Sequence, residues 1–291
     1  MSEQPDGGDY LRRRSTVLDR LKKDRGAVAG CIIVSLIVIC ALFAPYLTFY
    51  DPLKQDYNTL LSSPSLAHPL GADQYGRDLL TRIVFGCRYA IIIGVSVVAI
   101  QLLIGVTLGL IAGYYGGMVE AMVMRMTDVM LSIPSVVLAV SIAGLLGGGI
   151  QNVIIAVAAV GWRGYTRLVW AEVLSIKRTA SVEAARALGC GDDRIILRHI
   201  LPQTVGSVIA YSSISIATAI LWAAALSFLG LGAQPPTPEW GAMLADGRDF
   251  MSDAWWIATF PGLAIMTTVV GFNFFGDALR DALDPKMGKR L

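Results

Sequence analysis

GAVAGCIIVSLIVICALFAPYL, residues 26–47, decides the class of fold because its 22 residues carry no charge. As a helix this stretch spans the roughly 30 Å of hydrocarbon in a bilayer. The alternative is a cleavable signal peptide, whose apolar core has about 7–15 residues and ends in a small-residue A-x-A site. The stretch is longer than such a core and lacks that site, so we expect it to form the first membrane helix.

The composition extends this expectation to the whole chain. Of its 291 residues 55% are hydrophobic and 16% are charged, with a mean hydropathy of +0.60. Soluble domains are about 45–50% apolar and about 25% charged. A net charge of only +2 leaves no basic face for a phosphate backbone, so we exclude nucleic acid as a partner. The four cysteines have no CxxC or metal-ligand spacing, so we expect no disulfide framework and no metal.

We expect six helices to cross the membrane, which makes this an all-α integral membrane protein. After residues 26–47 the apolar stretches are residues 89–114, 120–147, 150–162 and onward, 205–231 and 254–276. The fourth reaches the ~20 residues of a crossing only if Arg163 and Arg167 emerge along a continuing helix. The expected division is a tail (1–25), the first helix (26–47), an outer loop with an interfacial helix (48–88), a five-helix core (89–276) containing a cytoplasmic loop (163–203) and an outer loop (232–253), and a second tail (277–291).

The basic residues indicate the orientation, because lysine and arginine concentrate on the cytoplasmic side. With both termini inside, residues 1–25, 163–200 and 277–291 hold 18 of the 24 basic residues, whereas the outer loops hold five. We therefore expect a multi-pass protein of the cytoplasmic (inner) membrane with its N-terminus and C-terminus in the cytoplasm.

The chain lacks the motifs that an enzyme or a pump needs. It has no G-x-x-x-x-G-K-[ST] phosphate loop, and the glycine run at residues 147–149 is interpreted as a flexible turn. His68 and His199 fall on opposite sides of the membrane, and no G-x-S-x-G or H-E-x-x-H string occurs. We therefore name no catalytic residue and expect no nucleotide site.

The cytoplasmic loop at 163–203 carries the sharpest local pattern, SVEAARALGCGDDRIILRHILPQ. It predicts a short helix from about Val182 to Leu188, a stop at Gly189, and a second amphipathic stretch that ends at Pro202. Alanines let another protein approach the helix backbone, while Leu188 adds an apolar contact and Glu183 a charge at the helix start. The pattern favours a docking helix.

The spacing in this loop resembles the signature of ABC importer permeases: EAA, three residues, Gly, nine residues, usually isoleucine, one residue, Leu-Pro. His199 stands in the usual isoleucine place, and the form RHILP resembles the peptide-permease branch. The resemblance implies a type I ABC importer permease fold and a helix that couples to separate ATPase subunits, which would hold ATP and Mg, with no cofactor on this chain. The implied coupling residues are Glu183, Ala184, Ala185, Leu188, Gly189, His199, Leu201 and Pro202. The alternative is an interfacial helix without a partner.

Two flanking segments narrow the resemblance. HPLGADQYGRDLLTRIVFGCR at residues 68–88, and the strings GLGAQPPTPEWGAMLADGRDF, AWW, FPG and GDALRDALDP within residues 230–285, are similar to the C-type membrane subunit of oligopeptide and dipeptide permeases. This similarity implies peptide cargo, a second homologous permease subunit in a heterodimer, and an extracytoplasmic substrate-binding protein. Nickel and glutathione importers share these strings, so the cargo stays open.

The same segments also have a plain physical interpretation. Leu79, Leu80, Ile83 and Val84 recur at helical spacing and predict a helix on the outer membrane surface. Asp73 and Arg77 could form an ion pair there. An exposed pair of this kind contributes at most a few tenths of a kcal/mol to stability. Pro235, Pro236 and Pro238 stop the fifth helix, and Trp240, Trp255 and Trp256 are placed like interfacial aromatics.

Few polar residues lie inside the expected spans. Arg125 and Asp128 are three apart on the third, so we expect an intramembrane pair. The hydroxyls of the fifth span, with Gln101 and Asn273, either line a wet path for the cargo or mediate helix packing. The candidates for the path are Ser212, Ser213, Ser215 and Asn273.

The hypothesis from the sequence is a permease subunit of a peptide-importing ABC transporter that alternates between two states as partner ATPases bind ATP. Two other classes stay open. One is a stand-alone channel or a secondary transporter driven by an ion gradient. The membrane centres contain no unpaired aspartate or glutamate, which argues against coupling to protons. The other is a membrane scaffold that recruits cytosolic proteins through residues 163–203.

Overall fold

The computed structural model describes residues 24–283, and over that range the ordered elements are helices, with one isolated β-bridge between Ala72 and Asp78. Most of the expected tail at 1–25 and the end of the tail at 277–291 lie outside the described residues. The helices are α2 (Arg25–Leu47), α3 (Leu79–Tyr115), α4 (Gly117–Ser132), α5 (Ser135–Leu146), α6 (Ile150–Ile176), α7 (Ala180–Ala187), α8 (Asp192–Ile195), the π-helical turn η1 (Ile196–Ile200), α9 (Leu201–Phe228), α10 (Trp240–Gly247), the 3₁₀ turn η2 (Arg248–Phe250) and α11 (Trp256–Leu283).

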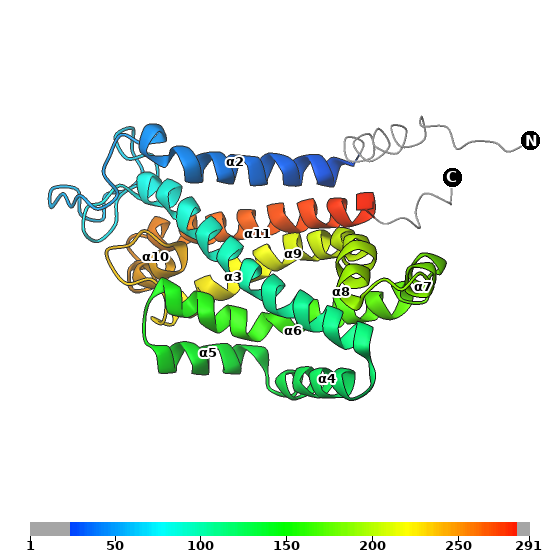
Figure 1. Ribbon diagram of the computed structural model, residues 1–291. Coiled ribbons are helices and arrows are strands. Elements are labelled where there is room, and N and C mark those ends of the chain that lie inside the picture. Colours follow the sequence, from blue (N-terminus) through cyan, green and yellow to red (C-terminus); the bar gives the residue numbers. More distant parts are fainter. Residues whose placement is uncertain (1–23, 284–291) are drawn as a thin grey trace, which may run out of the picture.

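The long helices run alongside one another, as Figure 1 shows. Helix α11 packs between α2 and α9, and α3 packs against α6 more extensively than any other pair of described helices do. The loop at residues 48–78 and α10 lie at one end of this bundle, whereas α7 and α8 lie at the other (Figure 1). The long helices therefore run between two ends of the protein, one formed by the loop 48–78 and α10 and the other by α7 and α8.

Three glycines explain the close pairing of α3 and α6. Gly105, Gly109 and Gly113 recur every fourth residue, so they share one face of α3. At Gly109 a Cβ atom would lie only 2.8 Å from the carbonyl oxygen of Thr166 on α6. Small residues at this spacing let membrane helices approach until their backbones touch.

Among residues 24–283, four continuous helical segments have the length and composition of a membrane crossing: Arg25–Leu47, Leu79–Tyr115, Asp192–Phe228 and Trp256–Ala282. The pair α4 and α5 makes a fifth if it is taken as one broken span. Helix α6 falls outside this set, but it continues past Arg163 and Arg167 to Ile176, as the fourth expected span requires. Residues 163–176, expected in the cytoplasmic loop, therefore belong to α6.

The expected uninterrupted helix over 120–147 is wrong, because α4 and α5 meet at an angle of 89°. The break lies at Ile133 and Pro134, between the two helices. Proline has no N–H, so Pro134 leaves the Met130 carbonyl four residues earlier without its helical donor. An average of hydropathy over this stretch does not register such a break.

The helix expected before the second span is not a separate element, since α3 is a single helix of 37 residues from Leu79. The Asp78 side chain caps it by accepting hydrogen bonds from Thr81 N at 2.8 Å and Thr81 Oγ1 at 2.7 Å. Leu79 and Arg82 are 0% and 2% exposed. One side of the first turns of α3 is therefore buried in protein, whereas Leu80, Ile83 and Val84 are half-buried.

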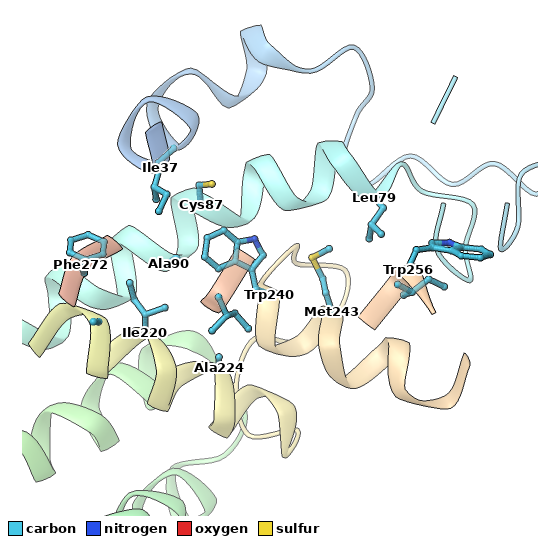
Figure 2. Close-up of a cluster of buried hydrophobic side chains, with 14 of the residues drawn as sticks. Ile37, Leu79, Cys87, Ala90, Ile220, Ala224, Trp240, Met243, Trp256 and Phe272 are labelled. Atoms are coloured by element: carbon cyan, nitrogen blue, oxygen red, sulfur yellow. The ribbon is translucent and has the colours of Figure 1, made fainter. Parts of the chain in front are cut away.

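Trp240 and Trp256 belong to the core, which corrects their assignment as interfacial aromatics. They are 3% and 7% exposed, whereas Trp255 is 50% exposed. The Trp240 indole Nε1 donates to the Ile83 carbonyl oxygen at 3.0 Å, and the Trp256 Nε1 donates to that of Ala72 at 3.1 Å. In Figure 2 the Trp240 ring lies among side chains from α3 and α9 that include Cys87, Ala90, Ile220 and Ala224.

A buried charge network ties the loop 48–78 to α3 and α10. Arg77 Nε lies 2.6 Å from Asp73 Oδ2, and the Arg82 Nε lies 3.5 Å from the same oxygen. The Arg82 guanidinium also donates to the Pro52 carbonyl oxygen at 2.9 Å. The predicted pair of Asp73 and Arg77 forms, but its side chains are 4% and 3% exposed, so the expectation of an exposed pair is wrong.

Candidate functional site

A short helix projects from the end of the bundle opposite to α10, where the sequence predicts a docking element. This helix, α7, runs from Ala180 to Ala187, close to the predicted Val182–Leu188. Gly189 follows with φ +75°, a left-handed conformation that ends a helix and that glycine adopts without strain. Val182 and Ala185 are buried, whereas Glu183, Ala184 and Leu188 are exposed. Leu188 is 84% exposed, so α7 presents a small-residue face with one apolar side chain.

Helix α7 packs at the end of the bundle that lies opposite to α10. Its buried residues share one apolar cluster with Tyr114 of α3, Val173 of α6 and Ile195 and Ile200 below α9. Two hydrogen bonds join the elements around α7. Tyr114 Oη of α3 donates to Asp192 Oδ1 of α8 at 2.5 Å, and Lys177 Nζ, just after α6, donates to the Gly113 carbonyl oxygen of α3 at 2.7 Å. The buried side of α7 is therefore packed together with α3, α6 and the segment that leads into α9.

The second half of the loop signature lies at the base of α9. The predicted stop at Pro202 is wrong, because α8, η1 and α9 form one continuous stretch from Asp192 to Phe228. A π-helical turn, in which Leu201 N donates to the Ile196 carbonyl oxygen, precedes Pro202 and accommodates its missing N–H. His199 and Leu201 are half-buried, and Pro202 is exposed. Helix α7 contacts α8 and η1, so the two halves of the signature lie together.

The predicted pair of Arg125 and Asp128 does not form. Within the part of the chain that the structure describes, the Asp128 carboxylate pairs with Arg167 of α6. A second contact between the same helices is the hydrogen bond from Trp170 Nε1 to Glu120 Oε1 at 3.0 Å. Arg125 instead lines an open depression of about 660 Å³, together with Met118, Met122, Met126 and Met130. Asp128 therefore pairs with an arginine of the neighbouring helix α6 and not with the arginine three residues before it on α4.

Arg163 holds the break between α4 and α5. Its Nη1 donates to the Met130 carbonyl oxygen at 2.7 Å, and its Nη2 donates to Ser135 Oγ. Met130 is the residue whose helical donor Pro134 removes, and Ser135 is the first residue of α5. The guanidinium therefore supplies a donor at a place where proline cannot.

A groove of about 350 Å³ opens between α3, α5, α6 and α9. Its polar lining residues are Gln101, Ser135, Arg163, Arg167, Tyr211, Ser215 and Thr218. The Gln101 carboxamide, 5% exposed, donates to the Val157 carbonyl oxygen at 3.3 Å. A Cβ at Gly161 would lie 2.0 Å from the Gln101 Nε2, so this glycine makes room for the amide.

Of the four candidates for the path, Ser215 lines this groove. The Ser212 hydroxyl donates to the Val208 carbonyl oxygen at 2.7 Å and accepts from Tyr165 Oη at 3.2 Å. Ser213 is buried against α11 and donates within its own helix. Asn273 is half-buried on α11 and lies outside the groove lining. The sequence did not single out Arg163 as a site residue, although a charge inside a membrane segment was the signal for it.

Comparisons with known proteins agree with this architecture. Residues 105–289 match the family described as binding-protein-dependent transport system inner membrane component, and residues 14–66 match the N-terminal TM domain of oligopeptide transport permease C. The inward-facing MetNI methionine ABC transporter is similar in fold, with a TM-score of 0.57 at 19% identity, over 71% of this chain and 98% of that chain.

Three relatives are similar over almost their whole length. The chain is 46% identical to the dipeptide transport system permease protein DppC of Alkalihalophilus pseudofirmus, over 92% of this chain and 88% of the relative. It is 45% identical to the di/tripeptide transport system permease protein DppC of Pseudomonas aeruginosa, over 91% and 89%. It is also 45% identical to the glutathione transport system permease protein GsiD of Pectobacterium atrosepticum, over 92% and 89%. The chain therefore belongs to the family of binding-protein-dependent transport system inner membrane components, as an ABC importer permease of the oligopeptide permease C type.

Proposed function

We propose that this chain forms one half of a heterodimeric channel that imports short peptides through the cytoplasmic membrane. The observation that carries the proposal is α7, an exposed small-residue helix whose buried side chains share an apolar cluster with α3, α6 and the segment that leads into α9. A helix fixed in this way transmits a push from a cytoplasmic partner directly to the helices that border the groove.

In this proposal six segments cross the membrane: the four continuous ones, the broken pair α4 and α5, and α6. Both termini lie in the cytoplasm. The distribution of basic residues supports this even without Arg163 and Arg167, because residues 1–25, 177–200 and 277–291 hold 16 of the 24. ATP and Mg bind to partner subunits, and α7 contacts those subunits through Glu183, Ala184 and Leu188. An extracytoplasmic binding protein delivers the cargo to the opposite end, where α10 and the loop 48–78 lie (Figure 1).

The cargo in this proposal is a dipeptide or a peptide of similar size, because similar relatives are named for dipeptides and di/tripeptides. Glutathione, itself a short peptide, is the second candidate, since a relative of equal identity is named for it. The groove supports both, because its lining combines amide, hydroxyl and guanidinium groups. A nickel cargo has less support, since the positive charge of Arg163 in the groove would repel a free cation.

The test uses the complete transporter reconstituted in proteoliposomes with its cognate binding protein. Leu188→Asp places a charge in the docking face without changing any buried contact of α7, so binding-protein-stimulated ATP hydrolysis and peptide uptake should both fall at least tenfold. Leu188→Met keeps the apolar contact and is the matched control, for which activity near the wild-type level is expected. Undiminished uptake by Leu188→Asp would contradict the proposal and favour a channel that works without the partners.

A scaffold function predicts a different result. It requires the loop to recruit cytosolic protein while no cargo crosses the membrane. If the assembled wild-type complex hydrolyses ATP but accumulates none of the peptides offered, including glutathione, the proposed import of peptides is wrong.

A further inference from the structure

Arg163 lies at a depth in the proposed membrane crossing where a positive charge is unfavourable without an anionic partner. It is the fourteenth residue of α6, so it lies about 20 Å along the helix from its first residue. In the proposed crossing this depth is within the hydrocarbon region of a bilayer roughly 30 Å thick. An ionisable residue at such a depth faces protein or water and normally has a partner.

The partners that Arg163 has are neutral. Its guanidinium donates to the Met130 carbonyl and to the Ser135 hydroxyl, and no carboxylate lies within 4.0 Å of it among residues 24–283. Arg167, the other arginine in the groove, is paired with Asp128. The groove lining contains no aspartate or glutamate. Arg163 therefore gives the groove an uncompensated positive charge.

The contacts of Arg163 orient the guanidinium but use only some of its N–H donors. An arginine has five N–H donors, and two are used, one on each side of the break between α4 and α5. The remaining donors are free to bind a planar anion such as a carboxylate. Because the break holds the guanidinium in place, little conformational entropy is lost when an anion binds.

The other groups in the groove match the rest of a short peptide. Ser215 and Thr218 present hydroxyls, the Gln101 carboxamide lies beside Gly161, and Trp222 and Tyr211 provide aromatic surface. The volume of about 350 Å³ is at the lower end of the range for small-ligand pockets, about 300–1,000 Å³. The groove therefore fits a molecule of a few residues with one anionic end.

We infer that Arg163 binds the free carboxylate of the cargo as it passes through the groove, so that the permease itself selects cargo with an anionic terminus. The inference rests on the proposed function, because it requires that a peptide crosses here. In this inference the cargo is selected twice, first by the binding protein and then by Arg163 of this chain within the membrane.

The test compares two cargoes that differ in one group: a dipeptide with a free C-terminal carboxylate and the same dipeptide as its C-terminal amide. Uptake is measured in proteoliposomes with the binding protein saturated by each cargo in turn. The result is the ratio of free-acid to amide uptake in a variant, divided by the same ratio in the wild type. Discrimination by the binding protein is common to both and cancels.

Arg163→Gln should lower this ratio about 10- to 100-fold, the range for loss of a charge-assisted hydrogen bond. A loss of the helix-break contact alone would reduce uptake of the two cargoes equally and leave the ratio unchanged. Arg163→Lys keeps the charge and should retain most of the preference for the free acid. Arg125→Gln removes an arginine outside the groove and is the control for the loss of one positive charge.

A second variant keeps the test valid if Arg163→Gln fails to assemble. Ser215→Asp adds a carboxylate to the same groove while Arg163 and its contacts stay intact, and Ser215→Asn adds the same size without charge. We expect the free-acid to amide ratio to be at least tenfold lower in Ser215→Asp than in Ser215→Asn. Equal ratios in these two proteins, or an unchanged ratio in an assembled Arg163→Gln transporter, would overturn the inference while leaving peptide import intact. A wild type that imports neither cargo would instead contradict the proposed function.

Discussion

The Arg163 guanidinium donates a hydrogen bond of 2.7 Å to the Met130 carbonyl oxygen across the gap between α6 and α4. This carbonyl is the one that the proline four residues later leaves without a helical donor. The bond thus links the position of α6, which borders the groove, to the right-angled turn between α4 and α5.

Replacing Pro134 should reveal whether the proline sets this turn. Pro134→Ala restores the missing N–H, so we expect the two helices to straighten in part of the population. Spin labels at the exposed positions Val119 and Leu145 would be about 27 Å apart for the right-angled arrangement and about 39 Å apart for a straight helix. Electron–electron double resonance measures this distance, and a distribution identical to that of the labelled wild-type protein would contradict the prediction.

The glycine face of α3 gives a prediction with a matched control. Gly109→Ala places a methyl group 2.8 Å from the Thr166 carbonyl oxygen, and we expect it to destabilise the protein by about 1–3 kcal/mol through overpacking. Gly144→Ala on α5 meets nothing within 4 Å, and should be neutral or stabilise by up to about 1 kcal/mol. Thermal unfolding in detergent compares the two, and equal shifts in melting temperature would contradict the role of the glycine face.

The buried network around Asp73 should be far more sensitive to charge removal than a surface pair. Asp73→Asn leaves Arg77 and Arg82 without their shared carboxylate, so we expect a loss of roughly 3–5 kcal/mol. Asp249→Asn disrupts the pair with Arg248, whose side chains are 72% and 66% exposed, and should change the stability by at most about 0.5 kcal/mol. Similar melting temperatures for the two variants would contradict the buried network.

The carboxyl of Asp246 on α10 predicts a specific pH dependence. Burial raises its pKa above the ordinary value, and the charges of Arg77 and Arg82 oppose this only in part. Between the ordinary and the raised pKa the folded state holds more protons than the unfolded state, so the contribution of this group to stability increases as the pH falls. The melting temperature of the wild type minus that of Asp246→Asn should therefore rise as the pH is lowered from 7 towards 4. A difference in melting temperature that stays constant or shrinks as the pH falls would contradict this prediction.

Local signals in the sequence were sufficient for α7. The start of the short helix, the stop at Gly189 and the exposure of Leu188 follow from residues within ten positions of one another. The apolar stretches also located the long helices, since a helix that crosses a bilayer needs a long apolar stretch. Their ends were predicted less well, because α3 begins at Leu79, ten residues before the predicted start at 89, and α11 ends at Leu283, seven residues after the predicted end at 276.

Contacts between distant parts of the chain could not be predicted in this way. Asp128 pairs with Arg167, 39 residues away, although Arg125 is closer in sequence. Trp240 is buried because its indole bonds to Ile83 of α3, 157 residues away, whereas its neighbours in sequence suggested a membrane interface. The role of Arg163 depends on the Met130 carbonyl, which becomes available only through the break in the preceding span.

The most direct test of the central claim is a photo-crosslink from α7 to a partner. A photoreactive amino acid at position 188 in the native complex should label an ATP-binding subunit, because Leu188 is 84% exposed on the docking face. The same amino acid at position 66, which is fully exposed on the loop at the other end of the bundle, should label the binding protein or nothing. Labelling of an ATP-binding subunit from position 66, or its absence from position 188 in a complex that hydrolyses ATP, would contradict the account.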